Sequence, residues 1–136
     1  MKRVMLDTNA YSALLSGDTA VRAALESATE ILLPLFVVGE LEAGFCGGLR
    51  YAENVAILQR FLDKPGVREV PAGHETAHLY GKLKDGLKRN GTPIPENNIW
   101  IAASVIEHAA ELITYDRHFT TIHKIRIWDH LGNNTA

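Results

Sequence analysis

Short apolar runs alternate along the chain with longer stretches in which apolar residues recur every three or four positions. The short runs predict buried strands, and the 3.6-residue period predicts helices that pack by one face. Strands are predicted at residues 4–6, 31–33, 67–70, 112–115 and 125–128. Helices are predicted at residues 8–17, 18–28, 35–45, 51–63 and 74–89, and from Pro95 onward. This alternation predicts an α/β fold in which helices cover both faces of a parallel sheet.

Turn-forming residues mark where the predicted elements end. Gly17 breaks the first helical stretch and Asp18 is suited to cap the next one, whereas Pro34 is expected to stop the second strand. Pro95 and Asn97 stand at the start of the last long helix, where Asn97 is a candidate cap. We find no internal repeat or linker, so the sequence predicts a single domain over residues 1–136 with a loose tail at 132–136.

Composition narrows the class of protein. A chain of 136 residues with 46% hydrophobic and 22% charged residues is long enough for one core. No apolar run approaches the ~18 residues of a membrane span, and the run before Asp7 is too short for a signal peptide. Cys46 is the only cysteine, which excludes an internal disulfide and favours the cytoplasm. The net charge of −2 argues against a strongly basic nucleic-acid-binding surface.

Two aspartates directly follow predicted strands, Asp7 after VML and Asp116 after LITY. The carboxyl ends of parallel strands form the ligand crevice of an open α/β sheet, so both carboxylates are expected there. Each Asp on its own is better explained as a cap of the following helix or turn, and only the two together, with a third acid nearby, favour the crevice. Glu40, in the helix after the second strand, is the third candidate. Glu42 lies about 200° around the same helix, so only one of these two glutamates can face the crevice.

Clustered carboxylates repel one another. At ~4 Å and an effective dielectric constant of ~20, each pair costs about 4 kcal/mol. A hard cation removes this conflict, and Mg²⁺ or Mn²⁺ prefers such oxygen ligands. A carboxylate-bound Mg²⁺ that keeps several waters is typical of phosphodiester hydrolysis.

Four ordered blocks carry a resemblance to a known family: LDTNAYSALL at 6–15, VVGELEAG at 37–44, PIPENNIWIAA at 93–103 and TYDRHF at 114–119. In these blocks the chain resembles PIN-domain ribonucleases, specifically the VapC-type toxins of bacterial toxin–antitoxin systems. The resemblance implies a three-layer α/β/α fold and a Mg²⁺- or Mn²⁺-dependent endoribonuclease that cuts tRNA or a structured rRNA loop. It also implies a homodimer, inhibited by an antitoxin protein that places a basic residue in the acidic site.

Carried over by position, the resemblance also implies roles for individual residues. Asp7, Glu40 and Asp116 match the acidic metal ligands of the family, while three further residues match positions that form hydrogen bonds in the site: Thr8, Asn9 and Thr114. Asn98 stands where the family has its remaining acid, directly before the apolar IWIAA run. We therefore expect the fold to be kept and the catalytic activity of this chain to be reduced or abolished.

Two other kinds of function compete with this interpretation. The first is a PIN-like module that binds RNA or antitoxin without cutting, which Asn98 favours. The second is a zinc peptidase, because His74-Glu75-Thr76-Ala77-His78 fits H-E-x-x-H and Glu96 follows as a possible third ligand. The peptidase would leave Asp7, Glu40 and Asp116 unexplained. Candidate phosphate contacts are Lys82, Lys84, Lys88, Arg89, Arg117, His118 and Lys124. The first four are better explained as the solvated face of a helix, and Trp100 is better explained by packing at a helix or subunit contact than by base stacking.

Overall fold

Five strands form one parallel sheet in the computed structural model, which describes residues 2–133. The strand order is β3-β2-β1-β4-β5, so that β1 lies in the centre with β2 and β4 on either side. The strands are β1 (Arg3–Leu6), β2 (Glu30–Pro34), β3 (Val67–Val70), β4 (Glu111–Ile113) and β5 (Arg126–Ile127). The expected parallel sheet is confirmed.

Four of the five strands differ at one or both ends from the sequence prediction, and β5 covers only 126–127 instead of the expected 125–128. Pro34 pairs with Val70 as the last residue of β2 instead of stopping the strand before it, because a proline at a strand end needs no N–H for the ladder. Strand β4 ends at Ile113, so that Thr114 and Tyr115 lie beyond it. The neighbouring β5 pairs only with Glu111 and Leu112, and β4 has no backbone partner strand past that point on this side.

The six predicted helices are confirmed: α1 (Thr8–Leu15), α2 (Thr19–Glu26), α3 (Leu35–Cys46), α4 (Tyr51–Leu62), α5 (His74–Arg89) and α6 (Glu96–Glu107). Two short helices were not predicted, the 3-10 helix η1 (Arg117–Thr121) and α7 (Asp129–Asn133). Asp18 caps α2 as expected, since its carboxylate accepts from the Val21 N–H at 2.9 Å. Asn97 is not a cap, because α6 begins after Pro95 and Asn97 is already inside the first turn.

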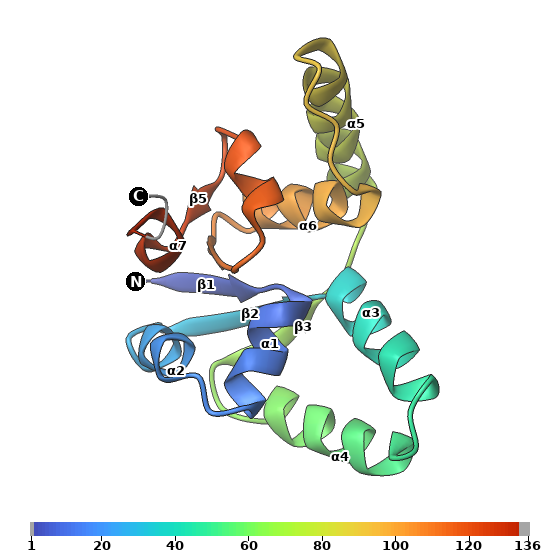
Figure 1. Ribbon diagram of the computed structural model, residues 1–136, viewed down its shortest axis with the longest axis vertical. Coiled ribbons are helices and arrows are strands. Elements are labelled where there is room, and N and C mark those ends of the chain that lie inside the picture. Colours follow the sequence, from blue (N-terminus) through green and yellow to red (C-terminus); the bar gives the residue numbers. More distant parts are fainter. Residues whose placement is uncertain (1, 134–136) are drawn as a thin grey trace.

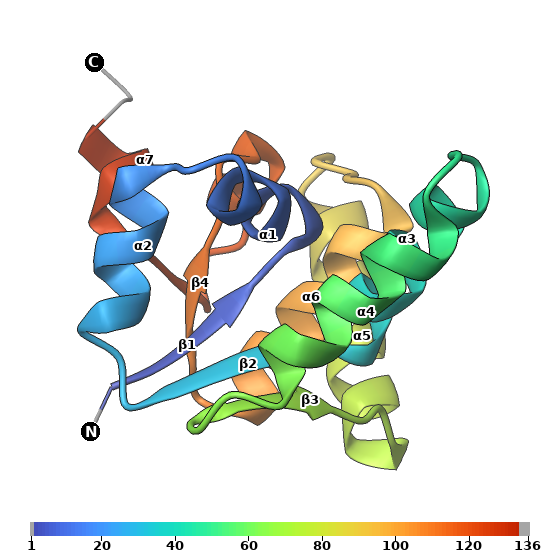
Figure 2. The same cartoon turned by 90° about the horizontal axis from the view of Figure 1, so that it is seen from below.

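Helices cover both faces of the sheet, as the three-layer α/β/α prediction requires. Helices α1, α2 and α4 lie on one face and α6 on the other, while α5 packs against α6 and projects away from the sheet (Figures 1 and 2). The core is one cluster, whose fully buried members include Val4, Met5, Leu6, Leu32, Leu33, Leu112 and Ile113 of the three central strands. Both faces of these strands are buried, which explains why they are continuously apolar in sequence.

Residues 132 and 133, predicted as part of a loose tail, belong to α7, and the rest of that predicted tail lies outside the described residues. Within residues 2–133, no helix combines the length and apolar character needed to cross a bilayer.

Candidate active site

The candidate residues lie where the strand order changes direction. From β1 the chain builds outward through β2 and β3, and it then returns to place β4 on the other side of β1. Leu6 of β1 pairs with Ile113 of β4, so the residues that follow them, Asp7 and Thr114, lie next to each other at the carboxyl edge of the sheet. Such a switch point is where open α/β sheets bind ligands.

Asp7 is the buried centre of this edge. Its side chain is 4% exposed. One carboxylate oxygen, Oδ1, accepts from the Ala10 N–H at 2.9 Å and caps α1, while Oδ2 accepts from the Thr114 hydroxyl. Asp7 therefore caps α1 and also lies in the candidate site.

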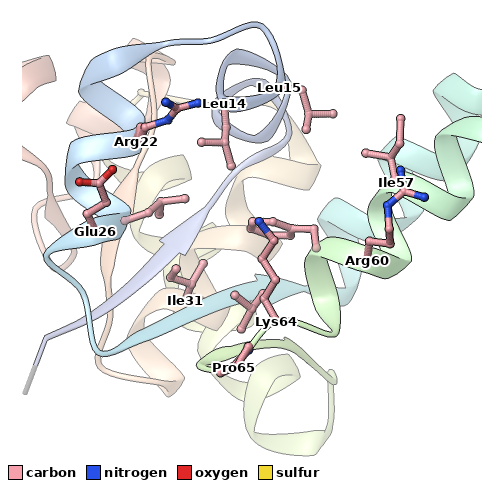
Figure 3. A pocket seen from close by; sticks show the side chains of 12 residues that line it. Leu14, Leu15, Arg22, Glu26, Ile31, Ile57, Arg60, Lys64 and Pro65 are labelled. Atoms are coloured by element: carbon pink, nitrogen blue, oxygen red, sulfur yellow. The ribbon is translucent and has the colours of Figure 1, made fainter.

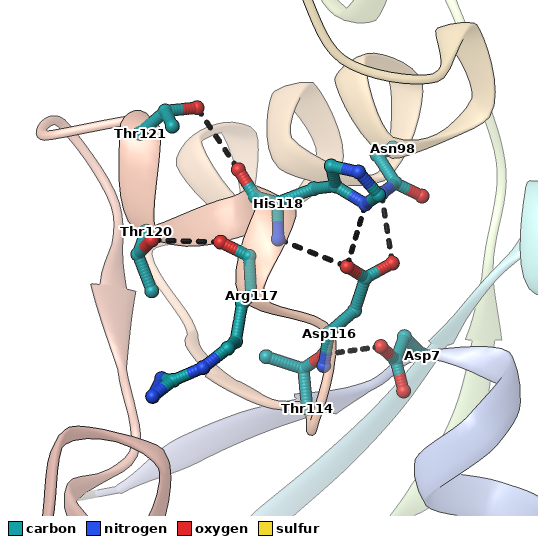
Figure 4. A network of polar contacts seen from close by, with 8 residues as sticks. All are labelled: Asp7, Asn98, Thr114, Asp116, Arg117, His118, Thr120 and Thr121. Atoms are coloured by element: carbon teal, nitrogen blue, oxygen red, sulfur yellow. Dashed lines mark hydrogen bonds and ion pairs between the residues drawn. The ribbon is translucent and has the colours of Figure 1, made fainter. Parts of the chain in front are cut away.

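Asp116 is arranged in a similar way at the start of η1 (Figure 4). Its Oδ1 accepts from the backbone N–H of His118 at 2.9 Å and contacts Nδ1 of the His118 imidazole at 2.8 Å. Its Oδ2 accepts from the amide Nδ2 of Asn98 on α6 at 3.0 Å. The Asp116 backbone N–H donates to the Thr114 hydroxyl oxygen at 2.9 Å, so Thr114 contacts both aspartates.

Glu40 joins the same site from α3. Its Oε1 accepts from the hydroxyl of Thr8, the residue after Asp7. Glu42 points elsewhere and accepts from the Tyr51 hydroxyl on α4 at 2.6 Å, which agrees with the ~200° between the two glutamates. Asn9 lies next to Thr8 and is exposed.

The charges of the three acids act on one another. Burial is the main cause that raises the pKa of Asp7 above its ordinary value of 3.8, and the charges of Asp116 and Glu40 raise it further, against the hydrogen bonds from Thr114 and Ala10. Burial also raises the pKa of Asp116, but the bonds from His118 and Asn98 and the charge of His118 outweigh it, so its pKa lies below 3.8. A buried carboxylate repelled by two others is an environment that a cation would stabilise.

The chemistry of the donors fits a hard divalent cation. Asp7, Glu40 and Asp116 offer carboxylate oxygens and Asn98 offers one amide oxygen, the ligand type of Mg²⁺ and Mn²⁺. Within residues 2–133, no three side chains of His, Cys, Asp or Glu lie close enough to one another to hold a metal ion by themselves. Any ion bound here would therefore depend on water, the Asn98 oxygen or substrate oxygens as well as on the acids.

Asp7 and Asp18 both cap helices, but their pKa values are shifted in opposite directions, so their replacement should have opposite effects on stability. The folded-state pKa of Asp7 is raised, so its contribution to stability is present below pH 3.8 and is lost as the pH rises through the folded pKa. In metal-free protein, Asp7→Asn should therefore raise the melting temperature at neutral pH, and this gain should vanish as the pH falls toward 3.8. An asparagine still caps α1 and can donate to the Thr114 oxygen.

Asp18→Asn is the matched control at the start of α2. The hydrogen bonds from Val21 and Tyr115 lower the pKa of Asp18 below 3.8, so its contribution to stability is present above 3.8 and is lost as the pH falls through its folded pKa. This variant should be less stable than the unmodified chain at neutral pH. Thermal unfolding in EDTA between about pH 3.5 and 7.5 measures both variants. Melting temperatures that move in the same direction would contradict the opposite shifts.

The H-E-x-x-H match lies in the first two turns of α5 with both histidines exposed. Thr76, between them, is fully buried and donates to Glu107, so the segment turns its threonine inward. Glu96 pairs instead with Lys84 and Tyr80. The segment thus has a structural explanation in the packing of α5 on α6.

Three other candidates outside the site, Lys84, Arg89 and Trp100, make local contacts. Lys84 binds Glu96, and Arg89 pairs with Asp85 at 3.1 Å. The Trp100 ring is stacked between Phe36 of α3 and Tyr80 of α5, with centroids 5.2 and 3.9 Å away. Trp100 therefore connects three helices, which favours the packing role over base stacking.

A groove of about 740 Å³ lies apart from the acids, between α1, α2 and α4 (Figure 3). Its lining is mainly apolar and includes Leu14, Leu25, Ile57 and Phe61, together with charged side chains at its rim. None of the four candidate residues of the acidic site lines it.

The contacts of two residues in the site region were not predicted. His118 contacts Asp116 through the tight turn of η1, and Trp128 donates its indole N–H to the Thr114 carbonyl at 2.6 Å. The TYDRHF block contains His118, but nothing in the spacing of that block indicates its ring contact. No sequence signal links Trp128 to residue 114.

Comparisons with known proteins agree with this geometry. The profile of the PIN domain matches residues 4–125. The chain is 28% identical over 116 residues to ribonuclease VapC1 of Haemophilus influenzae, a match that spans 82% of this chain and 85% of that protein.

Solved structures share the fold. VapBC2 from Rickettsia felis, bound to a DNA fragment from its promoter, has a TM-score of 0.81 at 24% identity and covers 93% of this chain and 97% of its own. VapBC-1 from nontypeable Haemophilus influenzae has a TM-score of 0.82 at 24% identity, with 93% and 96% covered. The profile match extends from β1 past η1 and includes all four candidate site residues. The chain belongs to the PIN-domain family.

Proposed function

We propose that this chain is the toxin of a bacterial toxin–antitoxin pair, an endoribonuclease that acts in the cytoplasm and hydrolyses tRNA or a structured rRNA loop. The observation that carries the proposal is the buried Asp7 beside Asp116 and Glu40 at the switch point of a PIN-type sheet. The similarity to a protein named as a ribonuclease supports the reaction class.

Asp7, Glu40 and Asp116, with the amide oxygen of Asn98, would hold Mg²⁺ or Mn²⁺. When bound, such an ion activates water and neutralises charge on a phosphodiester. The protein supplies the orientation of the ligands: Thr114 and Ala10 fix the two oxygens of Asp7, and Thr8 fixes Glu40. Carboxylates held in this way lose little conformational freedom when they bind a cation.

Asn98 would weaken the binding of the cation at this site. Its Nδ2 donates to Asp116 Oδ2 at 3.0 Å, so an amide dipole faces the carboxylate where the family places a second negative charge. We propose reduced or abolished activity for the chain as it stands. The same contact favours a second candidate function, a PIN-like module that binds RNA or antitoxin but does not cut it.

Metal removal tests the proposed reaction. Total tRNA and rRNA are incubated with the Asn98→Asp protein, in which we expect the stronger activity, in Mn²⁺, in Mg²⁺ and in EDTA. Cleavage should be lost in EDTA and restored by adding back Mn²⁺, because the bound cation would lower the pKa of the attacking water and neutralise the charge on the phosphodiester. Cleavage that persists in EDTA, or RNA that stays intact under all conditions, would exclude the metal-dependent ribonuclease.

The acidic site also suggests how a partner would recognise the protein. An antitoxin arm that places an arginine or lysine near Asp7, Glu40 and Asp116 would form charge-assisted contacts and exclude both metal and RNA. The Glu40→Lys variant should lower the affinity for such a partner at least ~10-fold, because it sets two positive charges against each other. Glu42→Lys is the control, since Glu42 is two residues away but bonds to Tyr51.

Co-expression with the reading frame next to its gene, followed by pull-down and calorimetry, measures this effect. Light scattering on the same samples determines the stoichiometry, for which we propose a toxin homodimer. Equal affinities for the Glu40→Lys and Glu42→Lys proteins would show that the partner does not use the acidic site.

A further inference from the structure

Strand β5, at the edge of the sheet beside the acidic site, is very short. Strand β5 has two residues, which pair with Glu111 and Leu112. The next residue, Trp128, donates its backbone N–H to the Leu112 carbonyl at 3.0 Å, and its indole Nε1–H donates to the Thr114 carbonyl at 2.6 Å. Trp128 thus donates to both carbonyls, with its backbone N–H to Leu112 and with its indole N–H to Thr114. The indole N–H takes the place of the backbone N–H that a longer β5 would provide.

The directions of the carbonyl groups explain why this works. Along an extended chain, successive carbonyls point to opposite sides, so those of Leu112 and Thr114 both face β5. The Ile113 carbonyl faces β1 and accepts from the Asp7 N–H at 3.4 Å. The segment that follows β4 is therefore held from both sides, by Asp7 and by Trp128.

The indole is firmly placed. Trp128 is 5% exposed and meets the Tyr115 ring edge-on, with centroids 5.3 Å apart. The Tyr115 hydroxyl in turn donates to Asp18 Oδ2 at 2.8 Å. A buried indole N–H without an acceptor costs free energy, so the bond to Thr114 is the favoured state.

The residue held by this bond connects the two aspartates. The Thr114 hydroxyl donates to Asp7 Oδ2 and accepts from the Asp116 N–H (Figure 4). A shift of the Thr114 backbone would therefore change the separation and orientation of both carboxylates at once.

We propose that Trp128 is a positioning residue of the acidic site, which sets the spacing of Asp7 and Asp116 through the Thr114 carbonyl. Its consequence for cation binding rests on the function proposed above, whereas its effect on the segment from Thr114 to Asp116 does not.

Trp128→Phe tests the proposal, because phenylalanine keeps an aromatic ring and removes the donor. In metal-free protein, amide hydrogen exchange at Asp116 should become about 10-fold faster, while exchange in β1 and β2 stays unchanged. The affinity for Mn²⁺ measured by calorimetry should fall about 10-fold, the loss typical for residues that orient metal ligands. Trp100→Phe is the matched control, and it should preserve both values because Trp100 packs between α3 and α5.

Unchanged exchange at Asp116 in Trp128→Phe would overturn the proposal, and so would exchange that accelerates equally throughout the sheet, which indicates a purely structural role. If Mn²⁺ binds to none of the proteins, the metal-dependent function fails, but exchange at Asp116 still decides the positioning role. Should Trp128→Phe not fold, the Trp100→Phe protein, in which Trp128 is the one remaining tryptophan, is produced with benzothienylalanine in place of tryptophan. This analogue replaces the indole N–H by sulfur and keeps the size of the ring. The same acceleration at Asp116 is then expected, and its absence has the same meaning.

Discussion

The Asn98→Asp variant is expected to cleave RNA at least ~100-fold faster than the unmodified chain, a gain of about 2.7 kcal/mol in transition-state stabilisation. The two side chains have nearly the same size, so the fold should not change. The variant adds one negative charge beside Asp116, where the Asn98 amide now donates to Oδ2 at 3.0 Å. Two carboxylates at this distance repel each other unless a cation or a shared proton lies between them, and the variant should therefore bind Mn²⁺ more tightly.

A matched control lies one residue away. Asn97→Asp adds the same charge to the same first turn of α6 without replacing the residue that bonds to Asp116. Initial rates on total tRNA at saturating Mg²⁺ or Mn²⁺ compare the three proteins, and expression in a bacterial host shows whether Asn98→Asp alone arrests growth. Equal rates for Asn98→Asp and the unmodified chain would show that position 98 has no catalytic role.

Removal of the Asp7 charge should have the opposite effect. In the Asn98→Asp background, Asp7→Asn is expected to reduce cleavage at least ~100-fold, about 2.7 kcal/mol, and to weaken Mn²⁺ binding. Asp7 is the buried member of the cluster and feels the charges of both Asp116 and Glu40. It is therefore the ligand whose charge is least screened by water.

The loss of activity should occur without a loss of stability. Asparagine keeps the cap on α1 and removes a buried charge, so metal-free Asp7→Asn should melt at least as high as its parent at neutral pH. Asp18→Asn, which also changes a helix-capping aspartate, should do the reverse and lose stability while keeping the cleavage rate. Cleavage that survives in Asp7→Asn would remove Asp7 from the catalytic site.

The fold could be predicted well because its signals are local. Each central strand is a short apolar run, and the six predicted helices each carry a 3.6-residue apolar stripe, with Asp, Pro or Gly near their ends. The short helices η1 and α7 carry no such signal and were not predicted. The end of β4 could not be predicted, since Thr114 and Tyr115 have strong strand propensity. The strand ends where both of its partners have ended: β5 pairs no further than Leu112, and the last residue of β1, Leu6, pairs with Ile113.

Part of the candidate site could likewise be predicted from the sequence, and part could not. Asp7 and Asp116 could be identified from their positions after strands, and the choice of Glu40 over Glu42 follows from helix geometry. The bond from Asn98 to Asp116 depends on the packing of α6 beside η1. The role of Trp128 depends on a hydrogen bond between two segments 14 residues apart. Such contacts leave no pattern along the chain, and only the three-dimensional arrangement shows them.

The central position of β1 has a consequence for synthesis of the protein. Asp7 is translated well before Thr114, whose hydroxyl fixes its Oδ2 from 107 residues away in sequence. Until β4 has emerged from the ribosome, β1 has an open edge and Asp7 has neither Thr114 nor Asp116 beside it. Long-range pairing of this kind forms late. A growing chain on the ribosome would thus carry no assembled acidic site until the segment from Thr114 to Asp116 had been made.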